Sequence, residues 1–493
     1  MRPKPRFTLS ILALLCGSML ASCRSSGSGG SAIITPDPTP KVVTCMATDK
    51  PETGLQGRVS REDHTSGRAA MGYNCNTQLV GHFTTVPAGQ APQGTIGGFK
   101  VERYVDRAGR ECAYYDSTLM FPTNAADATA GVMVLDMTNP AAPVRTAQLT
   151  TFAMDTPHES LVLSQQAGVL VANAGNAAGL PGYVDVYNLE PDCRSPTLVH
   201  SALVVSTGMV VGHESGLSPD GKTFFLASPG TPTLTAVDLT NANLLAPLPI
   251  LWSGSYTSHG LTISDNGNRA YVSNSNDEGV RILDISQIQA RVTNPVVREV
   301  GKVSWPTQTI PQNAIPFTRN GKPYLLEVDE YSADANGSVT AHGIRVGAAR
   351  IIDISDETKP VVISDLRLEV HQPENRAAIA NDPGAILPVQ GYAAHYCNVP
   401  AIKGADGIYR RTNPDIVACS MIISGLRIFD IRDPANPREV AYFNAPVKFR
   451  AAPEPSNWAM SSPTFVPERK EIWYTDGFQG FYVVRVTNDM WNP

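Results

Sequence analysis

The chain has 493 residues, of which 42% are hydrophobic and 17% are charged, with 40 glycines and 39 prolines. This composition fits an all-β protein with many turns rather than a helical or disordered chain. The formal net charge of -6 provides no positive field that would attract phosphate groups, so we expect no nucleic-acid partner.

The first residues have the organisation of an export signal. Three basic residues precede an apolar run at 7–19, and the tetrad LASC ends this run at Cys23. The tetrad resembles the bacterial lipobox, in which the cysteine is lipidated and becomes the new N-terminus. We therefore expect residues 1–22 to be a lipoprotein signal peptide and Cys23 to attach the protein to a membrane. An ordinary cleaved secretory signal with a coincidental cysteine is the alternative.

The residue after the lipobox cysteine is Arg24 rather than aspartate. By resemblance to Gram-negative sorting, this favours the outer membrane and thus the cell envelope as the location. Residues 23–60 begin with a segment rich in serine, glycine and proline, and we expect them to form a flexible tether and lead-in. A strand-like run follows at 77–86, TQLVGHFTTV, with no preceding partner strand.

A repeated unit of about 45 to 50 residues fills the chain from Cys112 onward. Its clearest copy, residues 258–286, has alternating apolar runs separated by an Asp-Asn-Gly turn, which predicts antiparallel strands joined by tight turns. A strand-only repeat of this length is typical of a propeller blade. Six copies contain a run that ends in aspartate or asparagine, at Asp136, Asn188, Asp238, Asp284, Asp353 and Asp430.

A degenerate seventh copy at 481–489 closes the chain without a following strand. The unpaired run at 77–86 can supply that strand by pairing with residues 481–486. We therefore predict an all-β fold over residues 61–493, with negligible helix: a seven-bladed β-propeller whose last blade is closed by an N-terminal strand.

The motifs VRILDIS, ARIIDIS and LRIFDIRDPANP resemble the LVIVD repeat family, a group of bacterial and archaeal exported β-propeller proteins. The resemblance covers the chain from about residue 72 to the C-terminus. It implies the propeller and an extracytoplasmic setting, and it implies no particular activity.

The repeated aspartates end strands and precede turns, which suits carboxylates that cap the backbone N–H groups of their own turns. We therefore expect a structural role for them and no catalytic one. A separate acidic group, Glu327, Asp329 and Glu330, is a candidate for cation binding at the channel rim or simply a solvated loop.

Four histidines precede the first strand of a blade at the same point of the repeat: His158, His213, His259 and His395. First strands line the central channel of a propeller, so these imidazoles are expected to converge, with the first three closest together. Histidine is a common ligand of iron, copper and zinc. Glu159 and Glu214, each directly after its histidine, are candidates for further ligands or acceptors.

By analogy, the arrangement resembles the axial metal sites of carotenoid oxygenases and methanethiol oxidases. The alternative is that these polar residues line a wet channel and bind water or backbone. The corresponding segments of blades one, five and seven, taken as residues 111–118, 312–320 and 460–468, lack the histidine. A purely structural role does not need such asymmetry.

Six cysteines follow Cys16 and Cys23, and an even number in an exported chain favours disulfides. Cys397 and Cys419 bracket an irregular insertion, and they are the first predicted pair. Cys75 with Cys112 is the second predicted pair.

Two classes of function remain open. The first is a lipid-anchored envelope protein that acts as a binding or scaffold propeller for another envelope protein or a small ligand. The second is a metal-dependent enzyme, oxidoreductase-like, with its ion held by the histidines in the channel.

Overall fold

The computed structural model describes most of the chain. The described residues are 43–88, 95–117, 130–175, 183–204, 213–227, 234–240, 246–247, 258–274, 279–306, 309–336, 338, 340, 343–386, 391–447 and 457–493. The predicted signal peptide and Cys23 lie outside these ranges.

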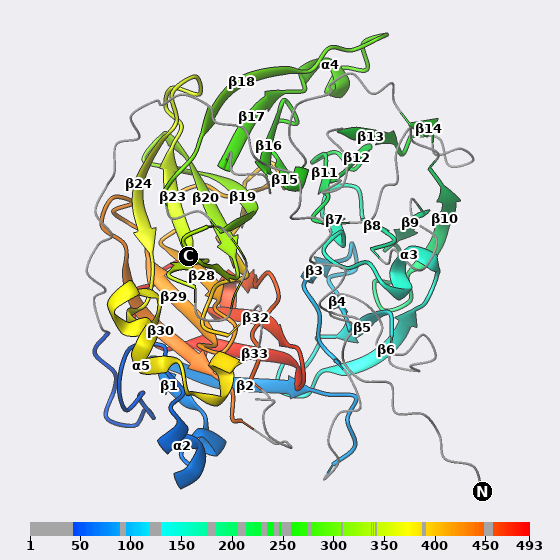
Figure 1. The fold of residues 1–493 in the computed structure, drawn as a ribbon. Helices are drawn as coiled ribbons and strands as arrows, with labels where there is room; N and C mark the ends of the chain where they lie inside the picture. The colour runs from blue at the N-terminus through cyan, green and yellow to red at the C-terminus, as the bar shows by residue number, and fades with distance from the viewer. Residues whose placement is uncertain are drawn as a thin grey trace, which may run out of the picture. The chain divides into compact units, whose positions relative to one another are not determined.

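Seven antiparallel sheets form the blades of a β-propeller, as the repeats predict (Figure 1). Blade 1 contains β3 (Val101–Val105), β4 (Glu111–Asp116), β5 (Val132–Asp136) and β6 (Val144–Leu149). Blade 2 contains β7 (Val162–Ser164), β8 (Val169–Asn173), β9 (Tyr183–Asn188) and β10 (Thr197–Leu203). Blade 3 contains β11 (Gly216–Leu217), β12 (Thr223–Leu226), β13 (Thr235–Asp238) and β14 (Ala246–Pro247). Blade 4 contains β15 (Ser258–Ile263), β16 (Arg269–Asn274), β17 (Gly279–Asp284) and β18 (Arg298–Val303).

The remaining blades carry additional elements. Blade 5 contains β19 (Ile310–Arg319), β20 (Lys322–Glu330), β23 (Ala349–Asp353) and β24 (Val361–Leu366). Blade 6 contains β25 (Tyr396–Asn398), β28 (Ile416–Ser420), β29 (Leu426–Asp430), β30 (Arg438–Asn444) and, at its outer edge, β1 (Tyr73–Cys75). Blade 7 contains β31 (Thr464–Val466), β32 (Glu471–Asp476), β33 (Gly480–Val486) and β2 (Thr77–Phe83). Two small hairpins extend from the ring, β21 (Ser332–Ala333) with β22 (Arg345–Val346) and β26 (Ile402–Lys403) with β27 (Tyr409–Arg410).

The predicted closure of the ring is confirmed. Strand β2 pairs antiparallel with β33, in a register that joins Thr77 to Val486 and Phe83 to Phe481 (Figure 1). The first strands of blades 1 to 6 contact one another in succession, and β3 contacts β31 of blade 7 where the ring closes. Apolar side chains pack between neighbouring sheets: Val101 and Tyr115 of blade 1, for example, share a buried cluster with Trp473 of blade 7.

The first blade starts earlier than expected. Its innermost strand was expected within residues 111–118, but residues 111–116 form the second strand, β4. The innermost strand is β3, and Gly97, Gly98, Phe99 and Lys100 lead into it. This prediction was wrong because β3, with the sequence VERYV, has charged residues at two of its five positions and lies before the first recognisable repeat motif.

Helices are short and few among the described residues. They are α2 (Arg61–Ser66), α3 (Phe152–Asp155), α4 (Ser286–Gln289) and α5 (Arg376–Ile379), with 3-10 turns η1 (Ala69–Met71), η2 (Glu369–His371), η3 (Pro373–Asn375), η4 (Pro383–Ile386) and η5 (Pro467–Arg469). None of the helices in the described ranges is long and apolar enough to cross a membrane.

The repeated aspartates have the structural role predicted for them. Each accepts a hydrogen bond from the backbone N–H two residues later, at 2.8 Å for Asp136 and 2.9 Å for Asp238. Asn188 makes the same contact in blade 2, at 3.1 Å. The side chain closes an Asx turn at the end of the third strand and fixes the path into the outer strand.

Three disulfides join the six cysteines after Cys23. Cys397 pairs with Cys419, as predicted. The predicted pair of Cys75 with Cys112 is wrong, because Cys75 bonds to Cys45 and Cys112 bonds to Cys193. The Cys45–Cys75 bond ties the described part of the lead-in to blade 6, where Val59 is fully buried in the core.

Candidate metal centre

The four candidate histidines meet near the propeller axis. His259 is the second residue of β15 and His395 directly precedes β25, while His158 and His213 lie in the segments that lead into β7 and β11. The ring centroids of His158 and His213 are 4.8 Å apart, and those of His213 and His259 are 4.2 Å apart. The imidazoles of three consecutive blades are therefore neighbours.

Glu159 connects these imidazoles to the fourth one. Its Oε1 lies 3.3 Å from Nε2 of His395 on the far side of the ring. Its Oε2 forms an ion pair with Nδ1 of His213 and lies 3.9 Å from Nε2 of His158. A single carboxylate from blade 2 thus contacts histidines of blades 2, 3 and 6.

Glu330, the last residue of β20, is the second carboxylate of the cluster. Its Oε1 lies 3.3 Å from Nε2 of His259, and its Oε2 lies 3.1 Å from Nε2 of His395. Glu330 was expected to group with Glu327 and Asp329, but those two side chains bind the buried guanidinium of Arg350. Strand alternation could have separated them, since residues 327 and 329 share one face of a strand and residue 330 lies on the other.

Two of the imidazoles are oriented by backbone carbonyls. Nδ1 of His259 donates to the carbonyl of Pro311, and Nδ1 of His395 donates to that of Met460, both at 2.9 Å. A carbonyl oxygen can only accept, so each Nδ1 carries its proton. This leaves Nε2 as the atom available to a ligand, an arrangement typical of metal-binding histidines.

Burial and charge push the pKa values of the cluster in opposite directions. Burial lowers the pKa of His158 to about 3 and that of His259 to about 4. Burial also opposes protonation of His395, but the carboxylates of Glu159 and Glu330 outweigh it and raise the pKa of His395 to about 9. Burial alone would raise the pKa of Glu159. The neighbouring imidazoles have the larger, opposite effect, so its pKa lies well below its ordinary value.

Glu214 was expected to be a ligand or acceptor beside Glu159, but it lies outside this donor cluster. Its carboxylate accepts hydrogen bonds from Lys100, from Tyr396 and, at 2.6 Å, from Asn313. Burial raises its pKa while Lys100 lowers it. These protein side chains occupy the carboxylate of Glu214, and the Lys100 ammonium balances its charge, so Glu214 is not offered to a metal ion.

Phe99 takes the place of a histidine in blade 1. Its fully buried ring lies 4.8 Å from the ring of His158 and 4.9 Å from that of His395. The carboxylate of Asp116 accepts from the backbone N–H groups of Phe99 and Lys100, at 3.0 and 2.8 Å, and thereby holds this wall in place. Burial raises the pKa of Asp116 to about 7.

The backbone at the cluster is under unusual constraint. His158 has a φ of 53°, which a residue with a Cβ rarely adopts, and such strain is concentrated at functional sites. Gly260, next to His259, is tightly enclosed, since a Cβ there would lie 2.1 Å from the carbonyl oxygen of Gln312. Only glycine allows β15 to approach β19 so closely.

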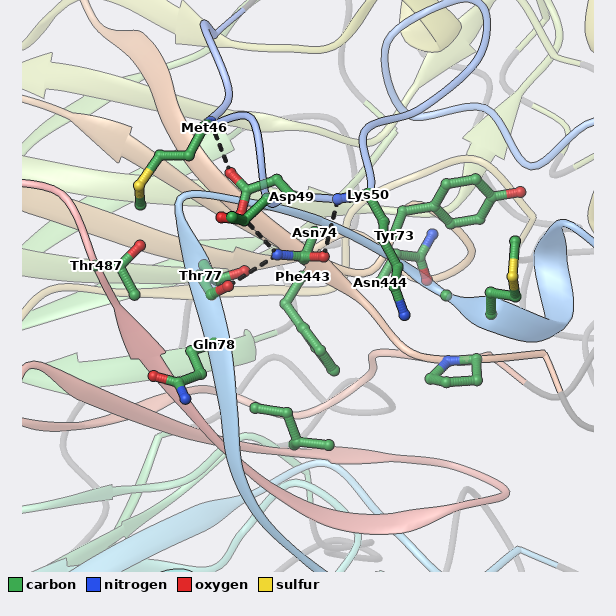
Figure 2. A pocket seen from close by; sticks show the side chains of 15 residues that line it. Met46, Asp49, Lys50, Tyr73, Asn74, Thr77, Gln78, Phe443, Asn444 and Thr487 are labelled. Carbon is green, nitrogen blue, oxygen red and sulfur yellow. Dashed lines mark hydrogen bonds between the residues drawn. The ribbon is translucent and has the colours of Figure 1, made fainter.

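Other groups of potential ligands in the described residues do not form a comparable site. Asp49 lies beside Cys45 and Cys75, and another pair of aspartates lies beside Cys193, but these thiols are consumed in disulfides. A cavity of about 490 Å³ lies where the lead-in meets blades 6 and 7 (Figure 2). There the Asp49 carboxylate is already occupied by the N–H of Met46 and the amide of Asn74.

Compared with protein-family models and with curated proteins, the chain matches none. Among solved structures it is similar to the β-propeller domain of Cps50 (Swd1) from Myceliophteria thermophila. The sequence identity is 12% and the TM-score 0.46, over 80% of this chain and 100% of that domain. A likeness at this level carries no argument about function. The resemblance to the LVIVD repeat family stays a prediction from the motifs.

Proposed function

We propose that the protein is a metalloprotein whose centre, near the propeller axis, binds iron, copper or zinc through histidine and glutamate. The observation that carries the proposal is the convergence of six donor side chains from five blades. Glu159, His259, Glu330 and His395 are buried, and His158 and His213 are partly buried. Burial and the neighbouring charges together strongly perturb the pKa values of several of these groups.

The energetic cost of this cluster argues for a function. Burying ionisable groups is expensive, and apolar side chains of similar volume would stabilise a propeller at least as well. Groups with strongly perturbed pKa values are concentrated at functional sites. A bound cation gives the two carboxylates and the free Nε2 atoms a common partner.

The donor types narrow the choice of metal. Imidazole is a suitable ligand for iron, copper and zinc, and these ions also accept carboxylate ligands beside it. Calcium prefers oxygen ligands alone, so four imidazoles disfavour it. With iron or copper bound, oxidoreduction would be the natural reaction class. The propeller fold is also consistent with a binding or scaffold role, which a metal centre does not exclude.

We further propose that the protein is exported and lipid-anchored at Cys23, as the lipobox-like tetrad and the LVIVD-like motifs suggest. Three disulfides in the described chain favour an oxidising compartment. Cys23→Ala should release the protein from the membrane fraction or block its processing. Unchanged membrane retention of this variant would contradict the lipid anchor.

The metal proposal is tested by elemental analysis of purified, tag-free protein. The wild type should contain iron, copper or zinc in stoichiometric amount, and His213→Ala, which removes a ligand, should contain less of it. His200→Ala is the matched control, because His200 lies on the outer strand β10 and should leave the metal content unchanged. A metal-free wild type that also fails to take up these ions would contradict the proposal.

A further inference from the structure

We propose that the centre holds two metal ions and that Glu159 bridges them. This inference rests on the proposed metal-binding function and adds the number of ions and the division of the ligands. One ion would be bound by His158 and His213, and the other by His259, His395 and Glu330.

The first support is the division of the donors into two sets. One atom each from His158, Glu159 and His213 lie within 4.8 Å of one another. The same holds for Glu159, Glu330 and His395, and His259 joins this second set through its contact with Glu330. Glu159 is the member that the two sets share.

The second support is the orientation of the shared carboxylate. Its Oε1 contacts His395, whereas its Oε2 contacts His158 and His213. A bridging carboxylate presents one oxygen to each of two ions, and ions in such paired sites lie about 3.5–4 Å apart. The two oxygens of Glu159 thus face imidazoles of the two different sets.

The third support is a set of buried atoms without hydrogen-bond geometry. They include Nε2 of His395 and one oxygen each of Glu159 and Glu330, although these atoms lie within ion-pair distance of oppositely charged neighbours. Well-made hydrogen bonds would aim these atoms at one another. Glu159 Oε2 faces the first set, whereas Oε2 of Glu330 and Nε2 of His395 belong to the second, so each set contains a buried atom whose hydrogen-bonding capacity an ion could satisfy.

Charge balance indicates what such a pair would bind. Two carboxylates neutralise one divalent ion, and Glu214 is already compensated by Lys100. A second divalent ion therefore requires two further negative charges, which hydroxide from water and anionic oxygens of a substrate can supply. The inference thus favours substrates with carboxylate, phosphate or peroxide oxygens over neutral ones.

Metal stoichiometry separates this inference from the proposed function. Metal-free full-length protein would be titrated with Cu²⁺ or Co²⁺, and bound metal would be measured per chain after removal of the free ion. We expect about two ions per chain. A value of about one would overturn the bridged pair while leaving a metalloprotein, and a value near zero would overturn both.

Variants of each set provide the second readout. His158→Ala and Glu330→Gln should each retain one ion, because each removes a ligand from a different set. In the Cu²⁺-loaded wild type, magnetic coupling between two bridged ions should reduce the electron paramagnetic resonance signal below that expected for the bound copper. Either variant should restore a full, uncoupled signal from its single ion. Loss of all metal from both variants, with circular dichroism unchanged, would indicate one shared site and refute the inference.

Discussion

Raising the pH should destabilise the metal-free protein through His395. Its imidazole is fully buried, and contact with Glu159 and Glu330 raises its pKa to about 9, against about 6.5 in an unfolded chain. A raised pKa stabilises the fold below pH 6.5, and this contribution disappears as the pH rises through 9. The difference corresponds to about 3 kcal/mol of unfolding free energy. The pKa of His213 is also raised, so His213 acts in the same direction.

The assay is denaturant unfolding between pH 6.5 and 9.5 with metal removed by a chelator and the disulfides intact. His395→Gln, which cannot take up a proton, should lose most of the dependence on pH over this range. His200→Gln, a change on the outer strand, should retain it. If the wild type is equally stable across the range, or if His395→Gln keeps the full slope, the charge assignment in the cluster is wrong. Bound metal should also flatten the slope, because it replaces the proton on Nε2.

Three further changes probe the surroundings of the centre. Lys100→Met should destabilise the protein by about 3–5 kcal/mol, because Glu214 is left buried without a cation, and adding Glu214→Gln should recover part of this loss in thermal unfolding. Gly260→Val should lower metal content as well as stability, since the new side chain would collide with β19 and displace the neighbouring histidine. Replacing both Cys397 and Cys419 with serine should cost about 3 kcal/mol in denaturant unfolding, with metal stoichiometry retained, because these sulfur atoms are not among the donors.

The fold was predictable because the same sequence motif recurs in each of the first six blades. The third strands end at the repeated aspartate or asparagine, as in β5 at Asp136 and β29 at Asp430, so the motif defined both strand and turn. The closing strand was also predictable, because the last blade lacked its outer strand and the run at 77–86 had no partner strand. Strand β3 was not predicted, because its charged residues interrupt the alternation of apolar residues and it contains no repeat motif.

The disulfides could be predicted within a blade but not between blades. Cys397 and Cys419 lie opposite each other on paired strands of one blade, so the hairpin pattern brought them together. Cys112 and Cys193 come from blades 1 and 2 and are 81 residues apart in sequence. Their pairing depends on how the loop after β9 folds back on its neighbour, and no repeat motif encodes that contact.

The asymmetry of the ring follows from the same geometry. Blades 5 and 7 lack a histidine at the channel, but they supply the carbonyls of Pro311 and Met460 that fix the tautomers of His259 and His395. Blade 1 supplies Phe99, whose ring packs against imidazoles from both sides of the cluster. Blades 5 and 7 therefore determine which nitrogen of His259 and His395 faces the centre, through contacts between blades that the repeat alone does not specify.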